Sequence, residues 1–399
     1  MIYKYKAVSQ SGEIIEGFFN GDSESEVISM LKGNEYLPIK IEEDIETAAQ
    51  VEFFSSKVKK RDLAVFCRQF YTMLDAGIGI VNCLDILEKQ SENKVLVKAL
   101  GALYEDVQKG FTLSEGMKKH QKVFPSLLIN MVEAGEASGN LDTIMERMAV
   151  HYEKENRLEN KIKSALIYPI VLAVVSIAVV IFLLVSVMPT FIGMFESSGQ
   201  DLPGPTQVLL GISNWLTEYW YIFITLVIGA IVGTSIFKKT LTGKTFFDNL
   251  KIKIPILKDT NTKIITSRFT RTLSTLLSSG MPLLQSMEIV GKVVGNKVVE
   301  DRLKIASEDI RKGVSLSQTI KNVKVFPPMV DSMIRIGEES GAIDDILYKT
   351  ADFYDDEVEV ALQKMTSLME PIMLVVMALI IGFIVISMAM PMFDMVNTI

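Results

Sequence analysis

Residues 66–80 read FCRQFYTMLDAGIGI, and residues 269–283 read FTRTLSTLLSSGMPL. The two stretches align at an offset of 203 residues, which places Gly77 on Gly280. Self-similarity over such a distance indicates that one structural unit occurs twice in the chain. In both stretches apolar residues recur at steps of three and four and a glycine follows. This pattern predicts a helix that ends at a glycine C-cap.

The likeness between the two units continues downstream of these stretches. Residues 135–142 read GEASGNLD and residues 337–344 read GEESGAID, aligned after a slip of one residue. Further on, MPTF at 188–191 matches MPMF at 390–393. We therefore expect each copy to consist of a small antiparallel helical bundle followed by an apolar helix.

Three apolar segments are long enough to cross a membrane. A helix needs about 20 apolar residues to span about 30 Å of hydrocarbon. A lysine at the centre of such a helix costs about 2.5–3.5 kcal/mol, and these segments contain neither Lys nor Arg. The predicted spans are residues 165–195, 218–237 and 369–394.

Basic residues beside the spans predict their direction. They precede the first and third spans and follow the second, whereas residues 196–217 and 395–399 contain none. By the positive-inside rule, the N-terminus and both bundles face the cytosol, and the C-terminus lies outside. The basic residues concerned are Arg157, Lys161, Lys163, Lys238, Lys239, Lys244 and Lys364.

A module of a different kind precedes the first copy. Residues 3–8, 13–20 and 37–41 alternate like strands, and residues 23–31 predict a helix. The sequence therefore predicts a small α+β module at the N-terminus.

The predicted fold class is mainly α: a polytopic membrane protein with two repeated cytosolic helical bundles, three transmembrane helices and this small N-terminal module. In chain order the predicted parts are the N-terminal module (1–48), a linker (49–61), the first bundle (62–164), the first transmembrane helix (165–195), an external loop (196–217), the second transmembrane helix (218–237), a cytosolic linker (238–265), the second bundle (266–368), the third transmembrane helix (369–394) and an external tail (395–399).

Composition excludes several classes of function. The formal net charge of −7 argues against a nucleic-acid binder, which needs a basic face. Cys67 and Cys83 lie in a segment that we place in the cytosol, so we expect reduced, packed thiols. His120 and His151 are the only histidines and lack metal-ligand spacing. We therefore predict no metal, no cofactor and no catalytic residue.

These residues together resemble the PilC/GspF family of inner-membrane platform proteins. The resemblance covers nearly the whole chain. It rests on the paired helix ends around Gly77 and Gly280, on both Gly-Glu-x-Ser-Gly segments, and on the Met-Pro-x-Phe sequences. No single motif is diagnostic, but their duplication in order, each copy followed by an apolar segment, is specific.

The resemblance implies a function rather than an enzymatic activity. Such proteins serve type IV pilus assembly by coupling a cytosolic hexameric assembly ATPase to the insertion of pilin subunits. The resemblance also implies contacts with pilins or pseudopilins and with inner-membrane alignment proteins, and a homo-oligomer, either a dimer or a tetramer. The expected location is the bacterial cytoplasmic (inner) membrane.

Other interpretations remain open at this point. The chain is alternatively the platform of a type II secretion system or of a competence pseudopilus. From other classes, a transporter subunit needs charged residues within the spans. An intramembrane enzyme needs catalytic partners there, and the hydroxyls of Ser176, Ser186 and Thr190 have no histidine or acid within the same predicted span.

The Gly-Glu-x-Ser-Gly segments are the candidate partner-contact turns. In one interpretation, Glu136 and Glu338 present negative charge to a partner. In another, the glycines permit a tight turn while Ser or Asp caps the next helix. A divalent cation on loop carboxylates is a third. The candidate residues are Gly135, Glu136, Ser138, Gly139, Gly337, Glu338, Ser340 and Gly341.

Four further residues are candidates for structural roles. Gly77 and Gly280 are expected to cap helices at their C-terminal ends. Pro169 and Pro371 align with each other, and we expect each to mark the start of a span, since proline is tolerated in the first turn of a helix.

Overall fold

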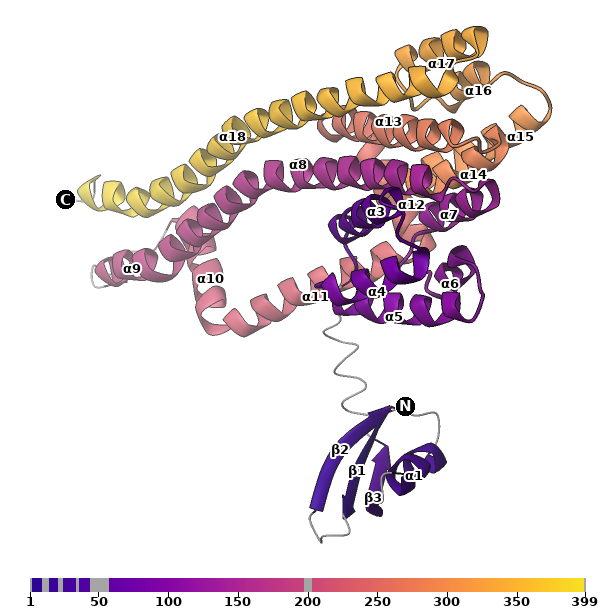
Figure 1. Cartoon of the computed structure of the whole chain (residues 1–399). Coiled ribbons are helices and arrows are strands. Elements are labelled where there is room, and N and C mark those ends of the chain that lie inside the picture. The colour runs from indigo at the N-terminus through magenta and orange to yellow at the C-terminus, as the bar shows by residue number, and fades with distance from the viewer. Residues whose placement is uncertain are drawn as a thin grey trace. The chain divides into compact units, whose positions relative to one another are not determined.

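The computed structural model describes residues 2–8, 14–20, 24–33, 36–43, 57–196 and 203–397 (Figure 1). Most of the predicted linker at 49–61, the first part of the predicted loop at 196–217 and the last two residues of the predicted tail lie outside these ranges. The chain divides into two compact units, Met1–Pro125 and Ser126–Ile399.

The N-terminal module is a three-stranded antiparallel sheet with one helix. Strand β1 lies at the centre, between β2 and β3. Ala7, Val27 and Leu31 are buried where the helix meets the sheet, so the predicted α+β module is confirmed. Its elements are β1 (Ile2–Val8), β2 (Ile14–Asn20), α1 (Glu24–Gly33) and β3 (Leu37–Glu43).

The first helical unit begins after this module. Phe66, Phe70 and Phe124 form its centre, and the ring centroid of Phe66 lies 5.6 Å from that of Phe70 and 5.8 Å from that of Phe124. The cysteines Cys67 and Cys83 are reduced and buried, as expected of packed thiols. The helices are α3 (Lys60–Asp75), α4 (Ile80–Gln90), α5 (Lys94–Gln108) and α6 (Leu113–Lys119).

The second copy repeats this arrangement. Phe269 and Phe326, the counterparts of Phe66 and Phe124, lie with their ring centroids 4.5 Å apart. The helices are α13 (Pro255–Ser278), α14 (Leu283–Val293), α15 (Lys297–Arg311), α16 (Leu316–Val323) and α17 (Pro328–Ser340); α7 (Ser126–Ser138) is the counterpart of α17 in the first copy. The predicted duplication is therefore visible helix by helix.

Glycines with left-handed backbone angles end equivalent helices in the two copies. Gly77 has φ of +79° and Gly280 has φ of +78°. The amide of Gly77 donates to the carbonyl of Leu74 at 2.9 Å, and the amide of Ile78 donates to that of Met73 at 2.9 Å. These two bonds define a Schellman cap, a geometry that glycine adopts without a Cβ penalty.

Two long helices carry the chain from the bundles into the apolar region. The first is α8 (Leu141–Phe182), which continues through a π-helical turn, η1 (Leu183–Val187), into α9 (Met188–Glu196). The second is α18 (Ile343–Asn397). The two pack against each other, and α13 packs along α18.

The expectation that Pro169 and Pro371 lie in the first turn of a helix is wrong. Pro169 lies inside α8 and Pro371 inside α18. An internal proline deprives the carbonyl four residues earlier of its amide partner. For Pro169 that carbonyl belongs to Ala165, and the hydroxyl of Thr366 on α18 lies 3.4 Å from it. The same hydroxyl lies closer, at 2.9 Å, to the carbonyl of Leu362 in its own helix. Helix α8 therefore continues through Pro169 with at most a long contact from α18 at the freed carbonyl.

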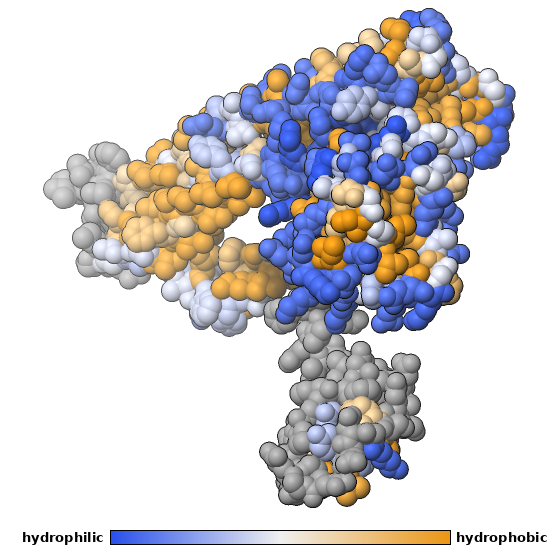
Figure 2. All heavy atoms as spheres, viewed as in Figure 1, coloured by the Kyte–Doolittle hydropathy of each residue, from blue (hydrophilic) through white to orange (hydrophobic). Residues whose placement is uncertain are grey.

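Between the long helices the chain forms α10 (Gly204–Glu218), α11 (Trp220–Lys239) and α12 (Leu241–Lys253). Most of the predicted external loop is thus helical, and helices also fill most of the predicted cytosolic linker. Within the described residues, three helices are long and apolar enough to cross a membrane: α8 with its continuation, α11 and α18. Figure 2 shows the apolar side chains gathered over the C-terminal parts of α8 and α18.

Candidate functional site

The Gly-Glu-x-Ser-Gly segments are largely helical rather than turns. Their first four residues form the last turn of α7 and of α17. Only the final glycines leave the helix, with φ of +73° at Gly139 and +71° at Gly341. The hydroxyl of Ser340 donates back to the carbonyl of Ile336 at 2.7 Å, so it does not cap the next helix.

The first glycine of each segment permits a close contact between helices. A Cβ added to Gly337 would lie 2.9 Å from the Cα of Ile343, at the start of α18. A Cβ on Gly135 would lie 3.0 Å from Cγ1 of Ile144 on α8. Cβ atoms almost never approach other atoms so closely. These glycines therefore allow α7 and α17 to pack onto the two long helices.

The carboxylate of Glu338 binds the N-terminus of α16. It accepts hydrogen bonds from the amide of Leu316 at 2.6 Å, the amide of Ser317 at 3.2 Å and the hydroxyl of Ser317 at 2.5 Å. The first amides of a helix lack partners within it and favour a negative charge. Glu338 therefore ties α16 to α17, which gives it a structural role inside the second bundle.

An ion-pair cluster joins α8, α13 and α18; its members are Lys154, Arg271, Asp352 and Asp355. The guanidinium of Arg271 is almost completely buried and lies 2.7 Å from Asp352 and 2.6 Å from Asp355. The ammonium of Lys154, on α8, lies 2.9 Å from the same carboxylate of Asp352. The cluster therefore connects a helix of the first copy with two helices of the second.

Charges within the cluster shift one another's protonation equilibria. Burial alone would raise the pKa of Asp352, but hydrogen bonds from Lys154 and Arg271 outweigh it and hold the pKa below its usual value of 3.8. Burial opposes the charge of Arg271, yet Asp355 and Asp352 raise its pKa above the usual value. Both shifts keep the groups charged near neutral pH, as expected of a structural ion pair.

The pattern of residues 269–283, which include Arg271, predicted a helix but not this role of the arginine. The missed signal is an arginine on the apolar face of an amphipathic helix, because a buried guanidinium requires acidic partners. Those partners lie about 80 residues further along the chain, on α18. Their pairing depends on how α13 packs, which the spacing of residues does not reveal.

Nothing in the described ranges has the geometry of a metal centre, since no group of three His, Cys, Asp or Glu side chains converges there. A small cleft of about 230 Å³ borders the ion-pair cluster. Its basic groups all come from α8 and its acidic groups all come from α18, and its lining includes no histidine, cysteine or serine. The lining residues are Lys154, Arg157, Leu158, Lys161, Asp352, Asp355 and Asp356.

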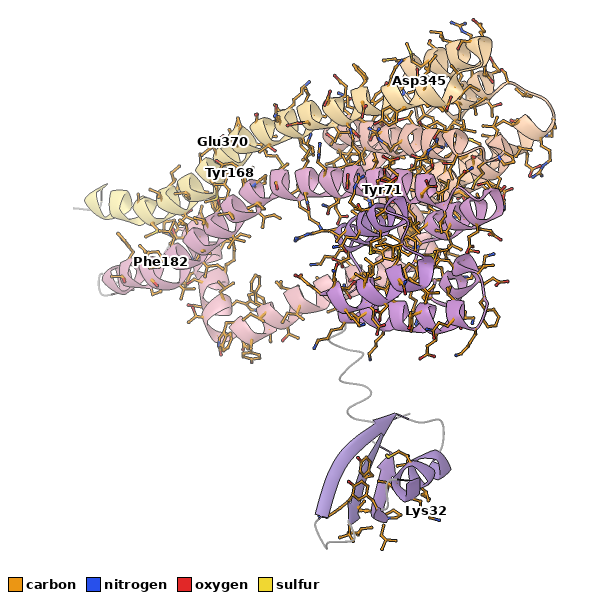
Figure 3. All side chains as sticks on the ribbon, in the orientation of Figure 1. Lys32, Tyr71, Tyr168, Phe182, Asp345 and Glu370 are labelled. Carbon is orange, nitrogen blue, oxygen red and sulfur yellow. The ribbon has the colours of Figure 1, made fainter. Side chains whose placement is uncertain are left out.

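The residues before the two internal prolines differ between the copies. Tyr168 precedes Pro169 on α8, and Glu370 precedes Pro371 on α18; both are labelled in Figure 3. Tyr168 and Glu370 are exposed. A carboxylate on this exposed face of α18, where α8 has a phenol, is a clear chemical difference between the two copies.

These features define a class: a membrane protein made of a duplicated helical unit, each copy continued by a long apolar helix. Residues 66–189 and 269–391 each match the family described as type II secretion system (T2SS), protein F. Residues 1–42 match the N-terminal domain of type II secretion system protein F. The chain belongs to the type II secretion system protein F family, which confirms the resemblance drawn from its sequence.

Relatives of the chain carry names from two systems. The chain is 35% identical to the type IV pilus assembly protein PilC of Myxococcus xanthus, over all of this chain and 95% of that protein. It is 35% identical to the PilC of Thermus thermophilus, over all of this chain and 98% of that protein. It is 33% identical to the type II secretion system protein F of Vibrio cholerae, over 99% of this chain and 98% of that protein.

Proposed function

We propose that this protein is an inner-membrane platform of type IV pilus assembly, which couples a cytosolic assembly ATPase to the insertion of pilin subunits. The observation that carries the proposal is the duplicated architecture, in which each bundle continues without a break into an apolar helix. A continuous helix transmits a displacement along its length, so a force applied at a bundle reaches the membrane.

The proposed topology places the N-terminus and both bundles in the cytosol and the C-terminus outside. Basic residues at the bundle ends of α8, α11 and α18 support it, because cytosolic flanks are enriched in Lys and Arg. We also propose that the cytosolic bundles extend over residues 62–164 and 266–368. The two family matches, which begin at residues 66 and 269, support these starting points.

The proposed partners are a hexameric assembly ATPase on the cytosolic side, pilins or pseudopilins in the membrane, inner-membrane alignment proteins and further copies of this chain. For the ATPase contact we propose the exposed ends of α7 and α17, including the candidate residues Ser138 and Ser340. Glu338 belongs to the same segment, but its carboxylate already accepts hydrogen bonds from the N-terminus of α16. The exposed neighbour Glu339 is the better test of charge at this surface.

Binding to the ATPase tests this function directly. The full-length protein in nanodiscs is titrated with the purified assembly ATPase of the same organism. We expect saturable binding that the charge reversal Glu339→Lys weakens, whereas Glu308→Lys, an exposed reversal on α15, leaves it unchanged. Absence of binding by the wild-type protein would contradict the coupling function. Equal effects of the two reversals would contradict the proposed contact surface.

A platform of a type II secretion or competence pseudopilus is the second candidate, since relatives from a secretion system are nearly as similar as those from pilus systems. Site-specific photocrosslinking from exposed membrane-facing positions such as Leu379 on α18 distinguishes the two. We expect crosslinks to a major pilin. Crosslinks to pseudopilins alone would assign the protein to a secretion or competence system.

A further inference from the structure

Two prolines near the ends of the long apolar helices leave backbone carbonyls without amide partners. Pro391 on α18 has no N–H, so the carbonyl of Ser387, four residues earlier, loses its usual donor. In the first copy, the amide of Met188 donates to the carbonyl of Leu183, five residues back, as in a π-helix. In this register Pro189 leaves the carbonyl of Leu184 without a donor.

Helix α10 supplies a hydroxyl to each of these carbonyls. The hydroxyl of Thr206 donates to the carbonyl of Ser387 at 2.5 Å, and the hydroxyl of Ser213 donates to the carbonyl of Leu184 at 2.6 Å. Both donors are almost completely buried, with 2% and 1% of their surfaces exposed. They lie seven residues apart, two turns along one face of α10.

Apolar contacts hold the same face of α10 between the two long helices. Leu209, which lies between the two donors on this face, packs with Leu184, Met188 and Ile384. These residues belong to the first copy and to the second. A single short helix therefore contacts the apolar ends of both copies. Its two hydroxyls meet them at the carbonyls of Leu184 and Ser387, which Pro189 and Pro391 have freed.

The other face of α10 is apolar, and the described residues leave it exposed. Val208, Ile212 and Trp215 are exposed, and 60% of the surface of Val208 is accessible. The helix contains no Lys or Arg, and Glu218 at its end is its only acidic residue. Leu184 lies about 30 Å along α8 from Lys163, the last basic residue before the apolar stretch, at 1.5 Å per residue. This distance places α10 near the far boundary of the hydrocarbon layer.

We propose that α10 is a membrane-embedded clasp, in which the hydroxyls of Thr206 and Ser213 replace the amide donors missing at Pro391 and Pro189 and thereby join the two apolar helices. In hydrocarbon no water satisfies a freed carbonyl, so a donor from a neighbouring helix is required. In this proposal, most of the segment predicted as an external loop in water (196–217) is a structural part of the membrane domain. It is independent of which partners the protein binds.

A double-mutant cycle tests whether each hydroxyl acts through its proline. Thr206→Val and Ser213→Ala are made in the full-length protein in nanodiscs, and thermal unfolding midpoints are measured. We expect each variant to lower the midpoint by about 2–4 °C. The matched control is Thr217→Val on the same helix, whose hydroxyl bonds only to the carbonyl of Ser213 in its own helix; we expect a smaller shift.

The cycle is completed by restoring the missing amides. In a Pro391→Ala background, Thr206→Val should lower the midpoint no more than the Thr217→Val control does, because the helix then satisfies its own carbonyl. Thr206→Val should keep its full effect in a Pro189→Ala background, and Thr206→Ser should behave as the wild type does. Effects of Thr206→Val that are equal in the two proline backgrounds would overturn the proposal.

Thiol labelling tests the position of α10 independently of stability. Val208→Cys is exposed on the protein but should resist a membrane-impermeant maleimide in vesicles opened so that the reagent reaches both sides. Glu308→Cys, exposed on α15, is the accessible control, and the native Cys67 and Cys83 are buried. Labelling of Val208→Cys as fast as the control would place α10 in water and overturn the clasp.

Discussion

Gly337 and Glu338 are neighbours on α17, yet they stabilise the second bundle in different ways. Gly337 contributes by having no side chain, because Ile343 lies where its Cβ would be. Glu338 contributes a carboxylate that satisfies amides at the start of α16. One residue fixes the distance between two helices, and the other fixes which helix end lies beside α17.

Gly337→Ala tests the close contact. The new Cβ would lie 2.9 Å from a backbone atom, which has to shift, so we expect a loss of about 1–3 kcal/mol in the free energy of unfolding. The matched control is Gly382→Ala on α18, where no atom lies within 4 Å of the added Cβ. Thermal or denaturant unfolding of the full-length protein measures both; equal stabilities would show that the helices tolerate the extra methyl group.

Glu338→Ala tests the cap on α16. Hydrogen bonds to a charged group contribute about 1.5–3 kcal/mol, and their removal leaves helix-terminal amides without a partner. We expect Glu338→Ala to destabilise the protein by this order of magnitude, whereas Glu339→Ala, an exposed neighbour, should be nearly neutral. Unfolding curves that do not distinguish the two variants would contradict the structural role of Glu338.

At the residue scale, the sequence predicted the structural role of some glycines and missed that of others. A glycine after an apolar helical pattern indicates a left-handed cap, and Gly77 and Gly280 have that geometry. Gly135 and Gly337 lie within helices, and their roles depend on how near a second helix lies. That distance is a property of packing, so the local pattern favoured a turn where the chain is helical.

At the scale of elements, α8 and α18 are the principal connections between bundle and membrane. The sequence predicted three apolar spans, and it placed Pro169 and Pro371 in the first turn of two of them. A local rule favours proline in a first turn. In the structure both helices continue through the proline. There α8 and α18 pack against each other, and this packing joins residues about 200 positions apart, which a local pattern does not reveal.

The ion-pair cluster between these helices predicts a pH dependence. The pKa of Asp352 in the folded protein lies below its usual value of 3.8. A carboxylate with a lowered pKa stabilises the folded state above its usual pKa, and this stabilisation is lost as the pH falls through the lowered value. The stability difference between the wild type and Asp352→Asn should therefore be full near neutral pH and shrink below about pH 4.

Unfolding midpoints of both proteins measured across this range check the prediction. Glu308→Gln, an exposed carboxylate on α15, serves as the control. If the stability difference between the wild type and Asp352→Asn stays constant or grows as the pH falls, the assigned charge state of the cluster is contradicted.

At the scale of the whole molecule, duplication explains the order of the parts. A bundle followed by one apolar helix leaves the chain on the far side of the membrane, so a second copy on the same side requires an additional crossing. Helix α11 is that crossing in the proposed topology, and Lys238 and Lys239 stand at its end. The repeat and the spans were readable in the sequence because both are patterns along the chain.

The surfaces that meet partners were not readable in the same way. A buried ion-pair cluster, or a carboxylate that caps a helix, has a defined partner within the chain, whereas the apolar side chains of α11 lie largely exposed in the described residues. The sequence and the geometry together reduce the partner surfaces to a few exposed helix ends and uncovered apolar faces. Binding measurements must choose among them.

The proposed function requires both bundles to lie on one side of the membrane and the C-terminus on the other. Reporter domains inserted in the α12 region after Asp248 and fused after Ile399 test this in living cells, with alkaline phosphatase and green fluorescent protein as the pair of reporters. We predict fluorescence and no phosphatase activity at Asp248, and phosphatase activity and no fluorescence after Ile399. Fluorescence at both positions would contradict the proposed topology and, with it, the platform.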